Sequence, residues 1–173
     1  GVGIARAVYG ATVQGCHFRN CRHSVSGGGT TPPVDAVIIN NISYDAIGQD
    51  YDCHESAIGW KFIGNSSEMG PNATGGFAIR GTDVVLDGNR INGGTITVSN
   101  TVAITGSTLG RVTMTNNIIK NTTNAILISN NYLNEISISG GIIENTTLNA
   151  IEITGAARNI KVYGVSFVDV PAK

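Results

Sequence analysis

Charged residues are scarce in this chain. Lysine, arginine, aspartate and glutamate make up 13% of its 173 residues, roughly half the share of an ordinary soluble domain. The formal net charge is −1, and no basic stripe occurs, which argues against a nucleic acid as the partner. Long apolar runs are also missing: none approaches the ~18 residues of a membrane-spanning helix. We therefore expect no membrane span.

Cysteine and helix-forming runs are also scarce. Cys16, Cys21 and Cys53 are odd in number and lack the spacing of a zinc site, so we expect small core or turn residues. Runs of lysine, glutamate, leucine and alanine are few, whereas valine, isoleucine, threonine and asparagine dominate, with 23 glycines. This composition favours short β-strands joined by tight turns.

A short apolar strand segment recurs along the chain, and each copy ends in a doublet, which is two consecutive residues that mostly have small or amide side chains. The doublets begin at intervals of 24 to 28 residues, at Gly15, Asn40, Gly64, Gly88, Asn116, Gly140 and Gly164. A second apolar strand segment alternates with the first along the chain and starts at Phe77, Val102, Ile126 and Ile151. A fixed period of this size indicates a solenoid, and alternation within short strands excludes a helical repeat. We predict an all-β parallel β-helix of about seven coils, with two or three strands in each.

The repeat fills residues 1–173 as one domain. A solenoid needs a cap at each end, because an open coil exposes its core and unpaired strand edges. No amphipathic helix is apparent near Ala11 or Pro171, so we expect this domain to be a fragment of a longer protein.

Because side chains alternate along a strand, those of the second strand segment divide between an inward and an outward face. One inward row should contain Val25, Cys53, Ile79, Ile104, Ile128 and Ile153. Asp52 and His54 then face outward, with Ser24 in the row of Asp52 and Arg80 beside His54. Neighbouring coils of a β-helix lie about 4.8 Å apart. These outward side chains should therefore form one patch, with Glu55 at the following bend.

This patch is the one cluster of potentially reactive side chains in the sequence. Its candidate catalytic residues are Asp52, His54, Glu55 and Arg80. Polyuronate lyases and epimerases need a cation to neutralise the uronate carboxylate and a side chain to move the C5 proton. Glycosidases need two flanking carboxylates, for which Asp52 with Glu55 or Asp50 are candidates. Candidate substrate-binding residues are Tyr51, Asp50 and Lys61.

Three other interpretations stay open. In the first, Asp52 and Arg80 form an ordinary surface ion pair and His54 is a solvated side chain. In the second, the chain is a non-catalytic shaft that binds glycans. In the third, it is a structural stalk. Asp35, Asp83 and Asp87 do not form a calcium-loop pattern, so we expect no metal and no other cofactor.

In its repeated strand segments, its coil length and its Asn-containing turns, the chain resembles the pectin-lyase-like, right-handed parallel β-helix superfamily over essentially its whole length. Asn41, Asn65, Asn89 and Asn117 recur at equivalent turns and look like the internal asparagine ladder of that superfamily. The resemblance implies a right-handed coil and a carbohydrate as the partner.

The stretch Asp52-Cys53-His54-Glu55 is similar to the Asp-Pro-His-(Glu/Asp) motif of mannuronan C5-epimerases. Carried over, His54 would transfer a proton and Asp52 would be its partner. Cys53 stands where that family has proline, and Gln49 where it has tyrosine. The chain also resembles bacteriophage tailspikes and polysaccharide depolymerases, which are trimers that bind and often cleave surface glycans. This resemblance implies an extracellular or virion location.

Four apolar side chains occupy outward positions of the first strand segment: Val37, Ile39, Ile63 and Val85. An external apolar stripe of this kind indicates a surface covered by another chain. We therefore expect a homotrimer.

Overall fold

The computed structural model describes residues 1–5, 7–93, 102–105, 110–129, 135–155 and 157–171. This part of the chain consists of strands and turns and contains no helix, and hence no helix able to cross a membrane. A seven-stranded sheet contains β2 (Thr12–Gln14), β5 (Val37–Ile39), β8 (Lys61–Ile63), β11 (Val84–Asp87), β14 (Arg111–Thr115), β16 (Glu135–Ser139) and β18 (Ile160–Tyr163).

A twelve-stranded sheet forms the other two sides of the coil. One side has β1 (Val2–Ala5), β4 (Val25–Gly28), β7 (Gln49–Cys53), β10 (Gly75–Ile79) and β13 (Val102–Ile104). The other has β3 (His17–Arg19), β6 (Ile42–Tyr44), β9 (Ser66–Glu68), β12 (Arg90–Asn92) and β19 (Ser166–Val168). The long strands β15 (Ile118–Ser129) and β17 (Ile142–Thr154) run through both sides and join them.

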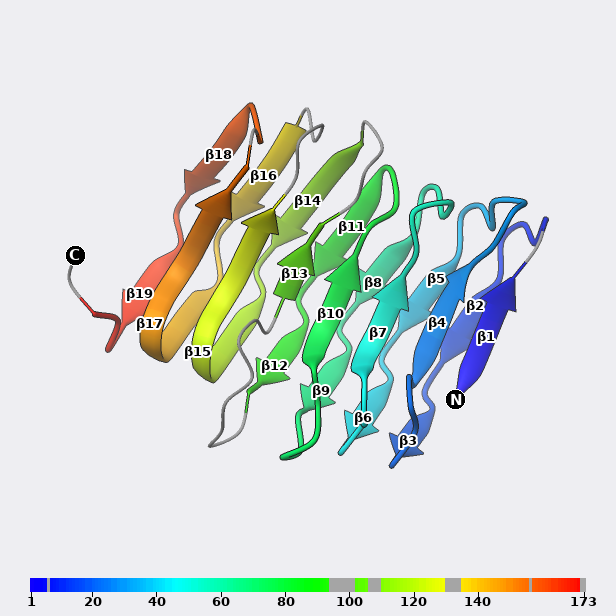
Figure 1. The fold of residues 1–173 in the computed structure, drawn as a ribbon, viewed down its shortest axis with the longest axis horizontal. Coiled ribbons are helices and arrows are strands. Elements are labelled where there is room, and N and C mark those ends of the chain that lie inside the picture. The colour runs from blue at the N-terminus through cyan, green and yellow to red at the C-terminus, as the bar shows by residue number, and fades with distance from the viewer. Residues whose placement is uncertain (6, 94–101, 106–109, 130–134, 156, 172–173) are drawn as a thin grey trace.

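Every strand pair in these sheets is parallel, and pairing follows the repeat, as in β5 with β8 and β8 with β11. In Figure 1 the strands of the near face run upward, those behind run downward, and successive coils move to the left. The coil is therefore right-handed, the hand expected for parallel crossovers. The predicted parallel β-helix is confirmed. It completes about six turns rather than seven, because the last repeat contributes only β18 and β19.

The doublets work as corners because their first residue adopts a left-handed backbone. All seven, from Gly15 to Gly164, have φ between 53° and 64°, a region that glycine and asparagine enter most easily. The second residue of four doublets is a buried asparagine, and the side-chain amides stack. The Nδ2 of Asn41 donates to Oδ1 of Asn65 at 3.0 Å, Asn65 to Asn89 at 3.1 Å and Asn89 to Asn117 at 2.9 Å.

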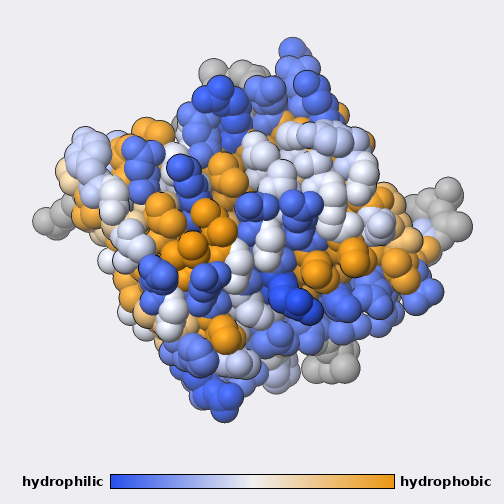
Figure 2. All heavy atoms as spheres, turned by 180° about the vertical axis from the view of Figure 1, so that it is seen from behind, coloured by the Kyte–Doolittle hydropathy of each residue, from blue (hydrophilic) through white to orange (hydrophobic). Residues whose placement is uncertain are grey.

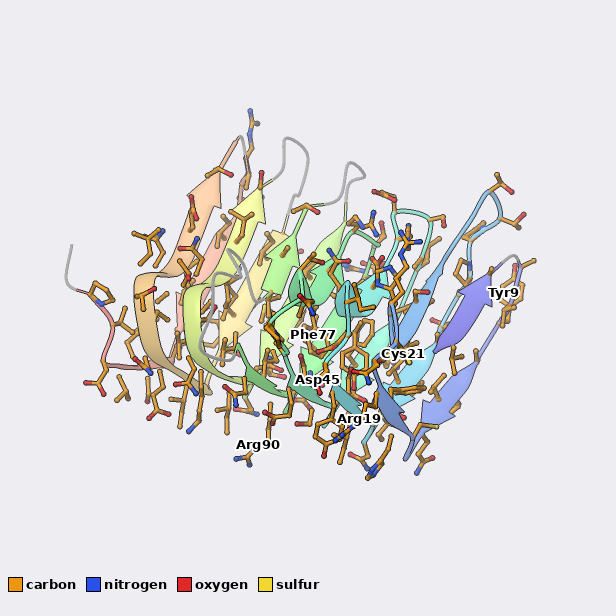
Figure 3. All side chains as sticks on the ribbon, turned by 60° about the horizontal axis from the view of Figure 1, so that its bottom comes forward. Tyr9, Arg19, Cys21, Asp45, Phe77 and Arg90 are labelled. Atoms are coloured by element: carbon orange, nitrogen blue, oxygen red, sulfur yellow. The ribbon has the colours of Figure 1, made fainter. Side chains whose placement is uncertain are left out.

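The core lies between the three sides, and its rows match the repeat. Ile79, Ile104, Ile128 and Ile153 pair in register, as predicted. Ile153 is nevertheless exposed, because the described chain has no further strand on that side to cover it. Figure 3 shows Phe77 inside the coil and Arg90 pointing away from it.

The register predicted for the first coil is wrong by two residues. Val25 pairs with Tyr51, Ser26 with Asp52 and Gly27 with Cys53, so Ser26 rather than Ser24 lies beside Asp52. The cause is steric: a Cβ on Gly27 would lie 2.3 Å from the Trp60 ring. The inward place opposite Cys53 is therefore left without a side chain, and the indole fills it.

The outward apolar stripe lies on the seven-stranded sheet, which faces the viewer in Figure 2. Val37, Ile39, Ile63 and Val85 are half-buried there, and the register places the exposed Lys61 between Val37 and Val85. The stripe is thus shorter and more interrupted than the sequence pattern indicated.

Candidate functional site

A groove of about 710 Å³ crosses the side of the coil formed by β4, β7, β10, β13 and the end of β15. These strands form the near face in Figure 1. Side chains from five successive coils line it, including Arg22, Asp52, Arg80, Thr105 and Leu127. The charged side chains gather at its N-terminal end, whereas the far end is neutral. A smaller hollow of about 320 Å³ beside Gly27 and Gly28 shares His54 and Ser26 with the groove and extends it toward β1.

Asp52 is the centre of the charged cluster. It lies outward on β7 between the inward residues Tyr51 and Cys53, yet it is only 3% exposed. Its Oδ1 accepts a hydrogen bond from the guanidinium of Arg80, and its Oδ2 lies 3.1 Å from Nε2 of His54. A carboxylate this deeply buried needs such partners, because an unpaired buried charge is costly.

Glu55 completes the cluster from the bend after β7. Its Oε1 lies 3.5 Å from the Arg80 guanidinium, and its Oε2 lies 4.0 Å from Nδ1 of His54. The four predicted catalytic residues are therefore brought together, with His54 and Glu55 partly exposed and Asp52 beneath them. The backbone holds this arrangement: His54 N–H donates to the Gly27 carbonyl and Arg80 N–H to the Cys53 carbonyl.

The three predicted substrate-binding residues do not line the groove. Tyr51 is fully buried, and its hydroxyl donates within the coil toward the carbonyls of Asn41 and Ser66. Asp50 is also fully buried: it follows the bend at Ile47 and Gly48, and its carboxylate contacts the buried Ser43 and Ser67. Lys61 is exposed on β8, on the other sheet.

Asp50 belongs to a buried network of hydroxyl groups. Its carboxylate accepts from Ser43 Oγ at 2.5 Å and from Ser67 Oγ, and Ser43 Oγ is 2.6 Å from Ser24 Oγ. Burial raises the pKa of Asp50 from its ordinary value of 3.8 to about 6, against the lowering effect of both serines.

Replacing Asp50 with asparagine should alter how stability depends on pH. Because the folded-state pKa is raised, the folded protein binds this proton more tightly than the unfolded chain. The resulting stabilisation is complete below about pH 4 and is lost as the pH rises toward 6. The loss amounts to about 3 kcal/mol. We expect urea unfolding at pH 4 to 7 to show that the free energy of unfolding of the wild type falls relative to that of Asp50→Asn as the pH rises. Asp169→Asn, at an exposed site, is the control, and a gap independent of pH would contradict the assignment.

Cys53 takes no part in the chemistry of the groove. The side chain is fully buried, and burial raises the pKa of its thiol to about 12, so it stays protonated at neutral pH. Cys16 and Cys21 are half-buried, and all three cysteines are free. Among the described residues, no group of three or more histidine, cysteine, aspartate and glutamate side chains is placed to hold a metal ion.

Sequence reasoning missed one functional candidate, His23. The side chain lines the groove, and its Nε2 lies 4.0 Å from Oδ2 of Asp52. The error in register hid it, since that register aligned His23 with the inward Tyr51. With Val25 paired to Tyr51, His23 lies beside Gln49, and its Nδ1 is 2.9 Å from the Gln49 carbonyl.

The geometry defines a right-handed parallel β-solenoid with a charged groove across its coils. Comparisons of the chain with protein-family models, with curated proteins and with solved structures found no match.

Proposed function

We propose that this domain binds an acidic polysaccharide in the groove and removes a proton from one of its uronate units, as a lyase or an epimerase. The observation that carries the proposal is the contact of His54 and Arg80 with one carboxylate, Asp52, on the floor of a groove that crosses five coils. A proton-transfer group and a cation within one site are what C5 proton abstraction requires.

The charges of the groove favour an anionic ligand. Two guanidinium groups, Arg22 and Arg80, line it against one carboxylate, Asp52. Arg80 is held by Asp52 and Glu55, whereas Arg22 is exposed and has no ion-pair partner among the described residues. Arg22 is therefore the cation that a ligand carboxylate can pair with at the least cost.

A glycosidase mechanism is less well supported. It needs two carboxylates that flank the bond, and Asp50 points into the core. Asp52 is engaged by Arg80 and His54 and is almost inaccessible. Glu55 is then the one exposed carboxylate of the cluster, and a single exposed carboxylate does not make a pair.

The shape of the groove supports a polymer. Successive coils repeat at about 4.8 Å, which is comparable with the length of one sugar unit in an extended glycan. The rows formed by Ser26, Asp52, Ala78, Ala103 and Leu127 run along this direction. Small side chains on both sides of Asp52 leave room for sugar rings.

The test is incubation of the domain with a panel of acidic polysaccharides, namely alginate, pectate, hyaluronan and bacterial exopolysaccharides. We expect one of them to lose viscosity with a rise in ultraviolet absorbance from an unsaturated uronate, or to exchange its C5 hydrogen with solvent without cleavage. Release of reducing ends without that absorbance would point to a hydrolase. Binding without any chemical change would support the non-catalytic glycan-binding shaft instead, and no binding would support the structural stalk.

We further propose that the domain works outside the cell or on a virion, as part of a homotrimeric tailspike or depolymerase. The support is the apolar stripe of Val37, Ile39, Ile63 and Val85 on the sheet away from the groove. A trimer formed through that sheet would leave all three grooves open. Sedimentation equilibrium of the isolated domain gives its mass, and a monomer at high concentration would contradict an interface made by this domain.

A further inference from the structure

His23 and His54 approach the same carboxylate oxygen, but their ring nitrogens have different surroundings. Nδ1 of His23 is 2.9 Å from the Gln49 carbonyl oxygen. A carbonyl can only accept a hydrogen bond, so this nitrogen carries the hydrogen and a neutral ring leaves Nε2 bare. Nε2 lies 4.0 Å from Oδ2 of Asp52, beyond hydrogen-bonding distance, and the ring lines the groove.

The position of the His23 ring is fixed by close packing. A Cβ on Gly48 would lie 2.8 Å from Cε1 of His23 and 2.7 Å from the Arg22 carbonyl oxygen. The next coil therefore leaves space for this imidazole only because residue 48 is glycine. The side chain is 18% exposed, so it is held in place yet open to a ligand.

His54 has an acidic group beside each nitrogen. Nε2 is 3.1 Å from Oδ2 of Asp52, and Nδ1 is 4.0 Å from Oε2 of Glu55. Nε2 thus has a carboxylate that can accept its hydrogen bond, and a second carboxylate lies near Nδ1, too far away for a direct bond. This arrangement suits a ring that carries two hydrogens and gives one away, whereas the surroundings of His23 suit a ring that accepts one.

We propose that His23 is the proton acceptor of this site and His54 the proton donor, with Asp52 between them. The assignment rests on the proposed function. In the elimination reaction, Nε2 of His23 takes the C5 proton of the uronate, and the electrons of the C5–H bond form a C4–C5 double bond. The bond from C4 to the glycosidic oxygen breaks with its electrons on oxygen, and that oxygen takes a proton from the His54 imidazolium. Exchange with solvent then restores both rings.

Several charged groups surround His23. Asp52 on β7 is the nearest acid, Arg80 follows β10, and Arg22 precedes it in the chain. The ring therefore shares the groove with one carboxylate and two guanidinium groups.

The closing experiment compares His23→Gln with His17→Gln on a polyuronate that the wild type turns over. His17 is exposed on β3, away from the groove. We expect His23→Gln to lower kcat by at least about 100-fold with little change in KM, and to abolish the fall in rate on the acid side of the pH profile. His54→Gln should instead abolish the fall on the alkaline side. Nitrogen NMR of the free protein should show the hydrogen of neutral His23 on Nδ1.

The outcomes separate the two levels of the proposal. Normal kcat and an unchanged pH profile in His23→Gln, with an inactive His54→Gln, would overturn the role of His23 and leave the proposed function standing. A neutral His23 with its hydrogen on Nε2 would overturn that role as well. If the wild type acts on none of the polyuronates, the proposed function fails before any variant is compared, and the assignment fails with it.

Discussion

Replacing Asn65 with alanine should lower the free energy of unfolding by about 3–6 kcal/mol, since each buried polar group left without a partner costs about 1–3 kcal/mol. Asn65 lies in the middle of the ladder and is fully buried. Its Oδ1 accepts from the backbone and side-chain nitrogens of Asn41 at 3.0 Å, and its Nδ2 donates to the Ile38 carbonyl at 2.8 Å. Alanine leaves these three groups without this bond and also removes the bond from Asn65 Nδ2 to Asn89 Oδ1, in a place that water cannot reach.

Urea unfolding measures this loss. Folded domains are stable by only about 5–15 kcal/mol, so the variant should unfold at a much lower urea concentration, and its melting temperature should fall by on the order of 10 °C. Asn72→Ala is the matched control, because Asn72 lies exposed in the turn before Ala73. A shift of Asn65→Ala no larger than that of the control would mean that the ladder contributes nothing to stability.

The ladder and the coil were predictable because their determinants repeat. A left-handed corner accepts few residue types, so Gly or Asn returns at every coil, from Gly15 to Gly164. A stacked amide satisfies its neighbour only if that neighbour is also an amide, so Asn41 and Asn65 recur 24 residues apart. Repetition turns a weak local signal into a strong one.

The register of the first coil could not be read in this way. Its strand, Val25–Gly28, has three small residues and offers a single bulky side chain to align. The true alignment depends on the Trp60 ring, just before β8, packing where Gly27 of β4 has no side chain. No spacing within the repeat encodes that contact. The slip of two residues kept the face of each side chain but displaced its neighbours, and His23 was lost from the site.

Asp50 shows a second limit of the pattern. Alternation places it outward with Asp52, but the strand begins just after the bend at Ile47 and Gly48, and the side chain reaches inward to Ser43 and Ser67. A usable signal was present in Ser43 and Ser67, which occupy equivalent interior positions one coil apart and both donate to Asp50. Two serines in an otherwise apolar row indicate a polar partner within the core.

Replacing His54 with alanine should reduce turnover of the polyuronate by at least about 100-fold, the contribution expected of a general acid–base group. His54 is 42% exposed and Asp52 keeps its bond to Arg80, so the melting temperature of the variant should fall less than that of Arg80→Ala. Arg80→Ala should reduce turnover by a similar factor, because the groove loses one of its two guanidinium groups. It should also destabilise the fold, since Asp52 is buried and loses the partner of its Oδ1.

Arg80→Lys separates the two roles of Arg80. Lysine keeps the charge that Asp52 needs but loses the planar guanidinium that contacts Asp52 and Glu55 together. We therefore expect Arg80→Lys to regain most of the stability and only part of the activity. Arg90→Ala, at an exposed arginine of β12 outside the groove, is the control for loss of a positive charge. If His54→Ala and Arg80→Ala both turn over the substrate at the wild-type rate, then Asp52, His54 and Arg80 form a structural cluster and the chemistry lies elsewhere on the molecule.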